Sequence, residues 1–99
     1  MNNKILTLLG FASKAGKLSF GFDSSVTAMK TGKSKLIVIA EDISQKSRKE
    51  ALFFADKSKV KYKDLEGIDI KALSDAVGKK CGIISVNDEN FAKACLNED

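Results

Sequence analysis

Two apolar runs limit the folds open to this chain more than any other feature. Residues 36–40 read LIVIA and residues 81–86 read CGIISV, so each run has the length of a strand and carries no charge. A strand that is apolar on both faces must be covered on both faces, which is typical of a sheet between two layers of helices. The sequence therefore predicts an α/β fold with Leu36–Ala40 as the central strand and Cys81–Val86 as a second buried strand.

Shorter helix-like and strand-like segments alternate around these two runs. We expect two further strands, at Lys17–Phe20 and at Val60–Tyr62, the second polar and near a sheet edge. Apolar residues at three- and four-residue spacing predict five helices. These run over residues 3–15, from residue 21 or 23 to Gly32, onward from Ser44 or Ser47, over residues 70–77 up to Gly78, and onward from Asn87 or Asp88. The pattern predicts a three-layer α/β/α sandwich with a small sheet of about four strands.

Two of these helix starts carry side chains suited to capping. Asp23 is a good N-cap for the second helix, because its carboxylate can accept a hydrogen bond from a free backbone N–H. Ser47 followed by Glu50 matches a capping box for the third helix.

Length and composition exclude several classes of site. The 99 residues suit a single domain over residues 1–99. The chain has no His, and Cys81 and Cys95 form no CxxC pair, so we expect no zinc site, no His-dependent catalysis and two buried thiols in a reducing compartment. The apolar residues between Ile5 and Ala12 have helical spacing, which favours an amphipathic helix over a signal peptide. We expect a cytoplasmic protein with no membrane attachment, metal or cofactor.

The positive charge is concentrated in the first third of the chain. Residues 1–35 hold six lysines and one aspartate, whereas residues 67–99 hold four basic and six acidic side chains. A field of this kind suits an anionic partner that docks on one side of the protein, although a solvated basic surface would look the same in the sequence.

Residues 10–17, GFASKAGK, nearly match a phosphate-binding P-loop. Five residues rather than four separate the two glycines, and Leu18 stands where Ser or Thr would hold magnesium. A predicted helix, not a strand, precedes Gly16. We therefore expect no nucleotide site here.

Two acidic residues, Glu41 and Asp42, follow the central strand directly. Ligands of open α/β sheets bind outside the carboxyl ends of strands, so a catalytic or magnesium-binding pair is one hypothesis. The other is a strand-to-helix turn whose carboxylates serve the loop. Nothing in the sequence makes further carboxylates converge here, which favours the loop.

The stretch most typical of a binding surface is GFDSSVTAMKTGKSK, residues 21–35. Free N–H groups at a helix start can hold a phosphate or a base edge. Lys30, Lys33 and Lys35 add positive charge, with Lys14 and Lys17 just upstream, and Lys79 and Lys80 after the fourth helix join the same patch if the fold brings them there. The candidate phosphate contacts are Lys14, Lys17, Lys30, Lys33, Lys79 and Lys80.

The order of these features resembles a known family. GFASKAGKLSFG, then KTGKSKLIVIAEDIS, LSDAVGKK and IISVNDENFAKA are similar to the L-seven-Ae ribosomal protein superfamily, and most of all to its small bacterial YlxQ-type branch. The resemblance covers about residues 5–96. It implies an α/β/α sandwich with a mixed four-stranded sheet, and RNA binding without catalysis, in many members to kink-turns.

The resemblance also implies three RNA-contacting segments. They are the start of the second helix, the loop after the central strand and the loop after the fourth helix. In this chain they are Gly21 to Thr27 with Asp23 and Ser24, Glu41 to Ile43 with Asp42, and Gly78 to Lys80 with Lys79. Ile43 would then be an apolar tip that packs on exposed bases.

The chain departs from the kink-turn motif of the family, Gly-x-Asn-Glu followed three residues later by Lys. It has Asp23 and Ser24 in place of Asn and Glu, and Thr27 in place of Lys. Guanine O6 and N7 accept hydrogen bonds, which an ionised Asp cannot donate. We expect weaker kink-turn affinity than the standard motif gives, or recognition of a different bent or single-stranded RNA.

These observations predict a monomeric, non-enzymatic RNA-binding protein associated with ribosomes or translation. Its partners would be ribosomal or other structured RNA, with ribosome or translation proteins as further candidates. A protein-interaction module that kept the fold and lost kink-turn affinity is the alternative, and a small magnesium-dependent hydrolase using Glu41 and Asp42 is a third hypothesis.

Overall fold

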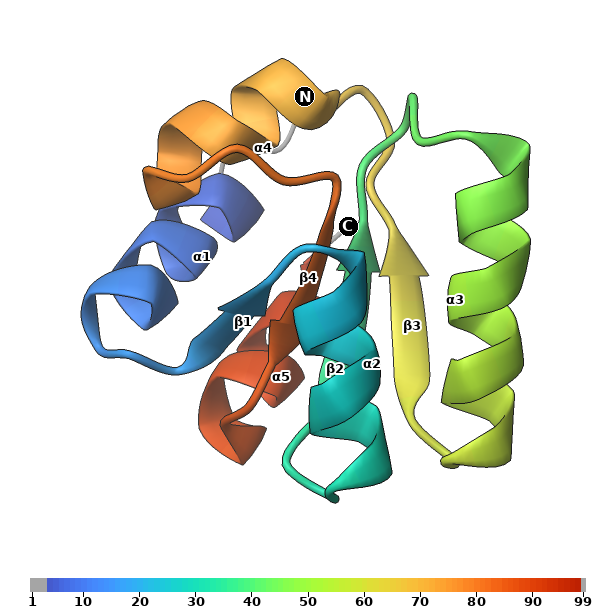
Figure 1. Cartoon of the computed structure of the whole chain (residues 1–99). Coiled ribbons are helices and arrows are strands. Elements are labelled where there is room, and N and C mark those ends of the chain that lie inside the picture. The colour runs from blue at the N-terminus through green and yellow to red at the C-terminus, as the bar shows by residue number, and fades with distance from the viewer. Residues whose placement is uncertain (1–3, 99) are drawn as a thin grey trace.

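Helices and strands alternate in the computed structural model, which describes residues 4–98 (Figure 1). The described elements are α1 (Lys4–Lys14), β1 (Leu18–Phe20), α2 (Phe22–Lys30), β2 (Leu36–Ile39), α3 (Gln45–Lys57), β3 (Lys61–Asp64), α4 (Ile70–Val77), β4 (Ile83–Val86) and α5 (Glu89–Leu96). All nine elements expected from the sequence are therefore present. Asn3, the first residue of the predicted first helix, lies outside the described residues. No helix among residues 4–98 is long and apolar enough to cross a membrane.

The four strands form one mixed sheet in the order β1-β4-β2-β3. β2 is parallel to β3 and antiparallel to β4, and β4 is antiparallel to β1. Every residue of β2 and β4 is buried, as the two apolar runs predict. β3 lies at the edge with Lys61 and Tyr62 exposed, which confirms the prediction of a polar edge strand.

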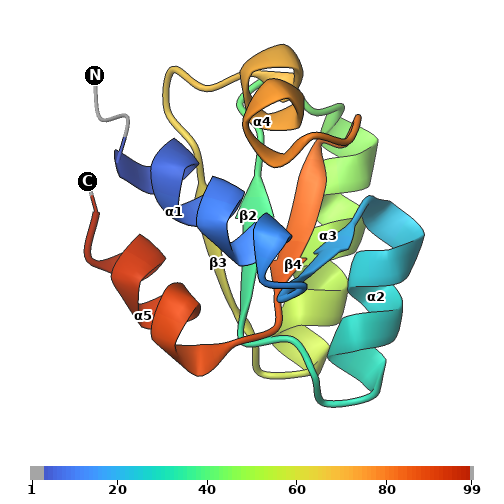
Figure 2. The ribbon, with the colours of Figure 1, turned by 90° about the vertical axis from the view of Figure 1, so that its left-hand side faces the viewer.

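Helices cover both faces of this sheet (Figure 2). Leu36 and Val38 pack in a cluster with apolar residues of α1, α4 and α5, whereas Ile37 and Ile39 pack in a second cluster with α2 and α3. Alternate side chains of a strand point to opposite faces, so a single apolar run supplies both clusters. The three-layer α/β/α sandwich is confirmed.

Several predicted element ends are wrong. Asp23 is not the N-cap of α2: Gly21 is, with φ of 87° and no side-chain cap, and Asp23 lies in the first turn. Ser44, not Ser47, caps α3, and its hydroxyl accepts a hydrogen bond from the Ser47 N–H at 3.2 Å. Of the two candidates for α5, Asp88 is the cap.

β4 begins two residues later than predicted, because α4 satisfies the backbone of Cys81. The Ser74 hydroxyl accepts a hydrogen bond from the Cys81 N–H at 3.0 Å and lies 3.2 Å from the Cys81 carbonyl oxygen, to which it can donate. Gly10 lies inside α1, so residues 10–17 form a helix end and a turn, not a phosphate-binding loop after a strand.

Candidate nucleic-acid interface

The sheet brings the three segments singled out by the resemblance to one of its ends. β4 is antiparallel to both β1 and β2, so the start of β4 lies beside the ends of the other two. The Gly21 N–H donates to the Ile83 carbonyl at 2.8 Å, and the Ala40 N–H donates to the Gly82 carbonyl at 2.9 Å. We call the resulting surface the loop face; it consists of residues 21–27, 41–43 and 78–80, at the end toward which β2 points (Figure 1).

The start of α2 offers backbone donors to the loop face. The first N–H groups of any helix have no partner within the helix, and no side chain caps them here. The helix dipole places a partial positive charge at the same point. Asp23, Ser24 and Thr27 are exposed around this start, whereas Val26 is buried in the core.

Glu41 and Asp42 hold the loop face together. A Glu41 carboxylate oxygen accepts a hydrogen bond from the Gly67 N–H at 2.9 Å, and an Asp42 oxygen accepts one from the Ile70 N–H at 2.8 Å. These bonds fix the loop after β2 against the segment that starts α4. Among residues 4–98 no cluster of acidic, Cys or His side chains could hold a metal ion. This geometry gives both carboxylates a role in the loop.

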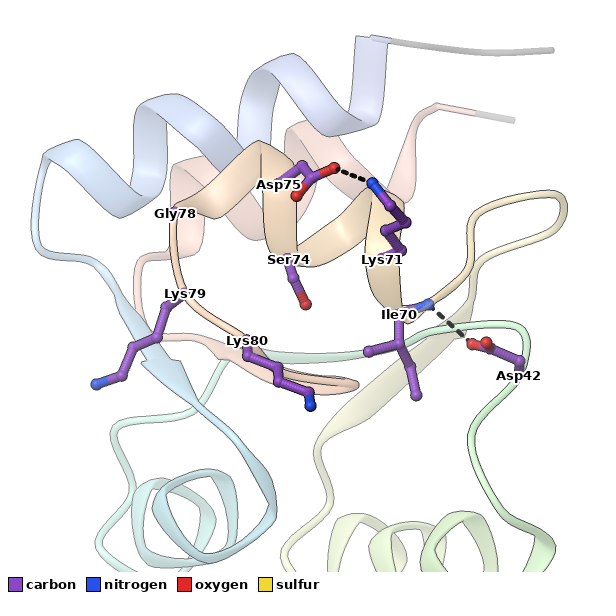
Figure 3. A pocket seen from close by; sticks show the side chains of 8 residues that line it. All are labelled: Asp42, Ile70, Lys71, Ser74, Asp75, Gly78, Lys79 and Lys80. Carbon is purple, nitrogen blue, oxygen red and sulfur yellow. Dashed lines mark hydrogen bonds and ion pairs between the residues drawn. The ribbon is translucent and has the colours of Figure 1, made fainter.

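α4 and the loop after it form the wall of an open pocket of about 710 Å³. Asp69 caps the start of α4 through the Ala72 N–H at 2.8 Å, and Gly78 ends the helix in the left-handed conformation with φ of 81°, as the sequence predicts. The pocket is lined by Asp42, Ile70, Lys71, Ser74, Asp75, Gly78, Lys79 and Lys80 (Figure 3). Lys71 is paired with Asp75 at 3.1 Å, whereas Lys79 and Lys80 extend from the loop.

Apolar groups lie next to these lysines. The Lys79 ammonium is 5.4 Å from the centre of the Phe20 ring, a cation–π contact. Ile43 is half-buried and Ile70 lines the pocket. Sequence reasoning missed Phe20 and the pocket side of Ile70; the spacing of Ile70 with Leu73 and Val77 predicts an inward position, but Ile70 is only half-buried.

Three of the candidate lysines lie at the other end of the sheet. The Lys17 carbonyl accepts a hydrogen bond from the Asn87 N–H, beyond the last residue of β4. Lys30 ends α2, about 12 Å from Phe22 at 1.5 Å per residue, and Lys33 follows it. Lys14 lies beside the end of α4, because its neighbour Ser13 donates to the Val77 carbonyl at 2.8 Å. Lys79 and Lys80 lie on the loop face itself, and Lys14 is at its border.

The structure combines a small mixed sheet, helices on both of its faces and three loop segments at one end. This arrangement defines the class of protein. A model of the ribosomal protein L7Ae/L30e/S12e/Gadd45 family matches residues 3–96, and the chain belongs to this family. The family expected from the sequence motifs is thereby confirmed.

The relatives include both ribosomal proteins and small bacterial proteins. The RNA-binding protein YlxQ of Bacillus subtilis is 29% identical over 91 residues, which are 91% of this chain and 89% of its own length. The large ribosomal subunit protein eL30 of Candida glabrata is 35% identical over 82 residues, 81% of this chain and 77% of its own. These matches support the expected YlxQ-type branch.

Solved structures show the same fold. A protein with unknown function from Bacillus halodurans C superimposes with a TM-score of 0.89 at 26% identity, covering 96% of this chain and 95% of its own. A 15.5kD RNA binding protein of Giardia lamblia shares the fold with a TM-score of 0.75 at 16% identity, covering 97% and 88%.

Proposed function

We propose that this protein is a non-enzymatic, cytoplasmic RNA-binding protein, associated with the ribosome or translation, that recognises bent, kink-turn-like or otherwise structured RNA through the loop face. The observation that carries the proposal is the convergence of three separate segments at one end of the sheet. The proposed contacts are Lys14, Gly21, Asp23, Ser24, Thr27, Glu41, Asp42, Ile43, Gly78, Lys79 and Lys80, with Lys17, Lys30 and Lys33 as outer contacts. The protein binds as a monomer.

Each part of the loop face has a role in this proposal. Backbone N–H groups at the start of α2 donate to a phosphate or to a base edge. Lys79 and Lys80 neutralise phosphates. Ile43 and Ile70 give an apolar floor on which unstacked bases of a bent RNA pack, since side chains cannot read the deep major groove of a regular RNA helix.

The relatives support RNA as the ligand. YlxQ of B. subtilis is named an RNA-binding protein, and eL30 of C. glabrata is named a protein of the large ribosomal subunit. Both align along most of this chain, so the alignments include the segments that form the loop face.

The test is a titration with a labelled kink-turn RNA and an unbent duplex at two salt concentrations. Binding to the kink-turn alone, weakened by salt, supports the proposal; equal weak binding to both RNAs contradicts recognition of a bend. The variant Lys79→Gln/Lys80→Gln should lower the slope of log K against log[salt] by about 2. The variant Lys49→Gln/Lys57→Gln removes the same charge from α3 and should leave kink-turn preference unchanged.

A second variant tests the motif directly. Asp23→Asn/Thr27→Lys replaces an acceptor with an amide donor and adds a cation at the start of α2. It should tighten kink-turn binding about tenfold or more, because one good pair of hydrogen bonds to a base edge gives about 1–3 kcal/mol. The gain must be confined to the kink-turn RNA; an equal gain on the duplex would show a simple charge effect.

One observation favours the protein-interaction module as a second candidate. Phe53 is 61% exposed on α3 and packs edge-on against Phe54 at 5.4 Å, and Phe54 packs against Phe22 at 6.5 Å. Exposed aromatic side chains of this kind are enriched in protein interfaces. Salt-insensitive association with a protein partner that is lost in Phe53→Ser, together with no RNA binding, would favour this candidate.

A further inference from the structure

A second basic surface lies at the end of the sheet opposite the loop face. It is a pocket of about 420 Å³ between the end of α2, the turn before β3 and α5. Its charged lining residues are Lys35, Lys59, Lys61, Lys93 and Glu89, so four positive charges meet one negative charge. We call it the lysine pocket. It shares no residue with the pocket on the loop face.

The lysines of this pocket carry more positive charge than the partial negative charges of the nearby helix ends neutralise. The carboxyl ends of α2 and α3 lie at this end of the sheet, and each contributes about half a negative charge. The start of α5 contributes about half a positive charge in return. With Glu89 included, a surplus of about two and a half positive charges is left for a ligand.

Two further features of the lining, at Ser34 and Lys59, are compatible with an anionic ligand. Ser34 is 6% exposed, and its hydroxyl makes no hydrogen bond with any residue in the described part of the chain. A buried hydroxyl without a partner is costly. The Ser34 oxygen is almost fully covered by protein atoms, so a phosphate oxygen can accept from it only when the residues around Ser34 move. Among residues 4–98, Lys59 is the only residue other than glycine with a positive φ, at 58°. Glycine would fit this turn without strain, but it would remove a charge from the pocket.

We infer that the lysine pocket binds backbone phosphates of a second RNA segment, so that one copy of the protein bridges two segments of RNA. The choice of RNA as the source of the phosphates rests on the proposed function. The molecule measures 30 × 27 × 23 Å, and the two surfaces lie at opposite ends of its sheet. A single short RNA contact cannot cover both, whereas two stems of a bent RNA or two separate helices can.

The experiment maps both surfaces at once on the full chain. Uniformly ¹⁵N-labelled protein is titrated with a kink-turn RNA whose two stems are lengthened. Amide shifts are followed at residues 21–27 and 78–80 for the loop face, and at residues 34–35 and 58–61 for the lysine pocket. Shifts at both ends are the expected result. Shifts at the loop face alone overturn the second surface and leave the proposed function intact. Shifts at the lysine pocket alone show phosphate binding there but overturn the bridge and the loop face, and no shift at either end overturns both surfaces.

Variants separate a binding role from a structural one. Lys35→Gln/Lys61→Gln/Lys93→Gln should reduce the slope of log K against log[salt] by about 2 to 3. Each phosphate that a lysine neutralises releases its counterions and contributes about 0.9 to this slope. The matched variant Lys46→Gln/Lys49→Gln/Lys57→Gln removes three exposed lysines of α3 that line neither pocket and should change the slope by less than 1. Equal effects of the two triple variants overturn the proposal.

Two single variants keep the test independent of folding defects. Lys59→Gly should raise the melting temperature or leave it unchanged, because glycine fits the turn, while RNA binding weakens several-fold. Ser34→Ala should weaken RNA binding by about tenfold, the effect of one hydrogen bond to a charged group, with no loss of thermal stability. Wild-type RNA affinity in both variants contradicts the inference.

Discussion

Replacing Asp42 with alanine should destabilise the fold by about 1 kcal/mol, although Asp42 is exposed and lies on the proposed binding surface. Its carboxylate accepts a hydrogen bond from the Ile70 N–H at 2.8 Å, at the first residue of α4. This N–H is one of the four at a helix start that have no partner within the helix. With alanine at position 42, the Ile70 N–H can bond only to water, and the loop after β2 loses its hydrogen bond to α4.

The expected shift in melting temperature follows from the length of the chain. Globular proteins gain about 2.1 cal/mol/K of unfolding entropy per residue near 60 °C, so 99 residues give about 0.2 kcal/mol/K. A loss of about 1 kcal/mol therefore lowers the melting temperature by about 5 °C. Asp42→Asn keeps an oxygen acceptor but loses the charge, so it should cost about half as much.

The assay is thermal unfolding followed by circular dichroism, with urea unfolding as a second measurement. Asp56→Ala, at an exposed aspartate in the last turn of α3, is the control and should change the free energy of unfolding by less than about 0.5 kcal/mol. If Asp42→Ala melts within 1 °C of the wild type, the Asp42 carboxylate does not stabilise the loop, and the structural reasoning is refuted.

Two further predictions concern α5 and its neighbour β3. Burial raises the pKa of Cys95 from 9.0 to about 11, against the attraction of Lys63, so the unfolded chain releases this proton at lower pH than the folded one. The free energy of unfolding should thus fall between pH 9 and pH 11, by about 2 kcal/mol more in the wild type than in Cys95→Ala. Urea unfolding at several pH values measures this, and the same pH dependence of stability in both proteins would refute the prediction. The Lys63 ammonium donates to the carbonyls of Cys95, at 3.0 Å, and Glu98, beyond the last turn of α5. Lys63→Met should therefore speed hydrogen exchange in the last turn of α5 and cost about 1 kcal/mol, whereas Lys49→Met should do neither.

The loop carboxylates show how far local reasoning reaches. The position of Glu41 and Asp42 after an apolar strand predicts a turn, and the absence of converging carboxylates disfavours catalysis. Their partners, the N–H groups of Gly67 and Ile70, lie 26 and 28 residues away in the sequence. No local pattern contains that pairing, because it depends on how the segment before α4 folds over the end of β2.

The N-cap of α2 shows a different limit. Asp23 is a common capping residue, but the chain leaves β1 through Gly21 with a positive φ, and the helix starts one residue before Asp23. The hydrogen bond from the Gly21 N–H to β4 fixes this start. A tertiary contact thus overrides a local preference that the sequence expresses clearly.

The amino-acid sequence by itself determined the elements and the layers. Apolar runs without charge require burial on both faces, and helical spacing supplies the covering surfaces, since burial of apolar area is the main driving force of folding. Only the tertiary structure decided which lysines share a surface. Lys79 and Lys80 lie on the loop face and Lys17, Lys30 and Lys33 toward the opposite end, because the strand order and directions set the end at which each loop emerges. Strand order arises from contacts between segments far apart in the chain, which no spacing of residues along the sequence records.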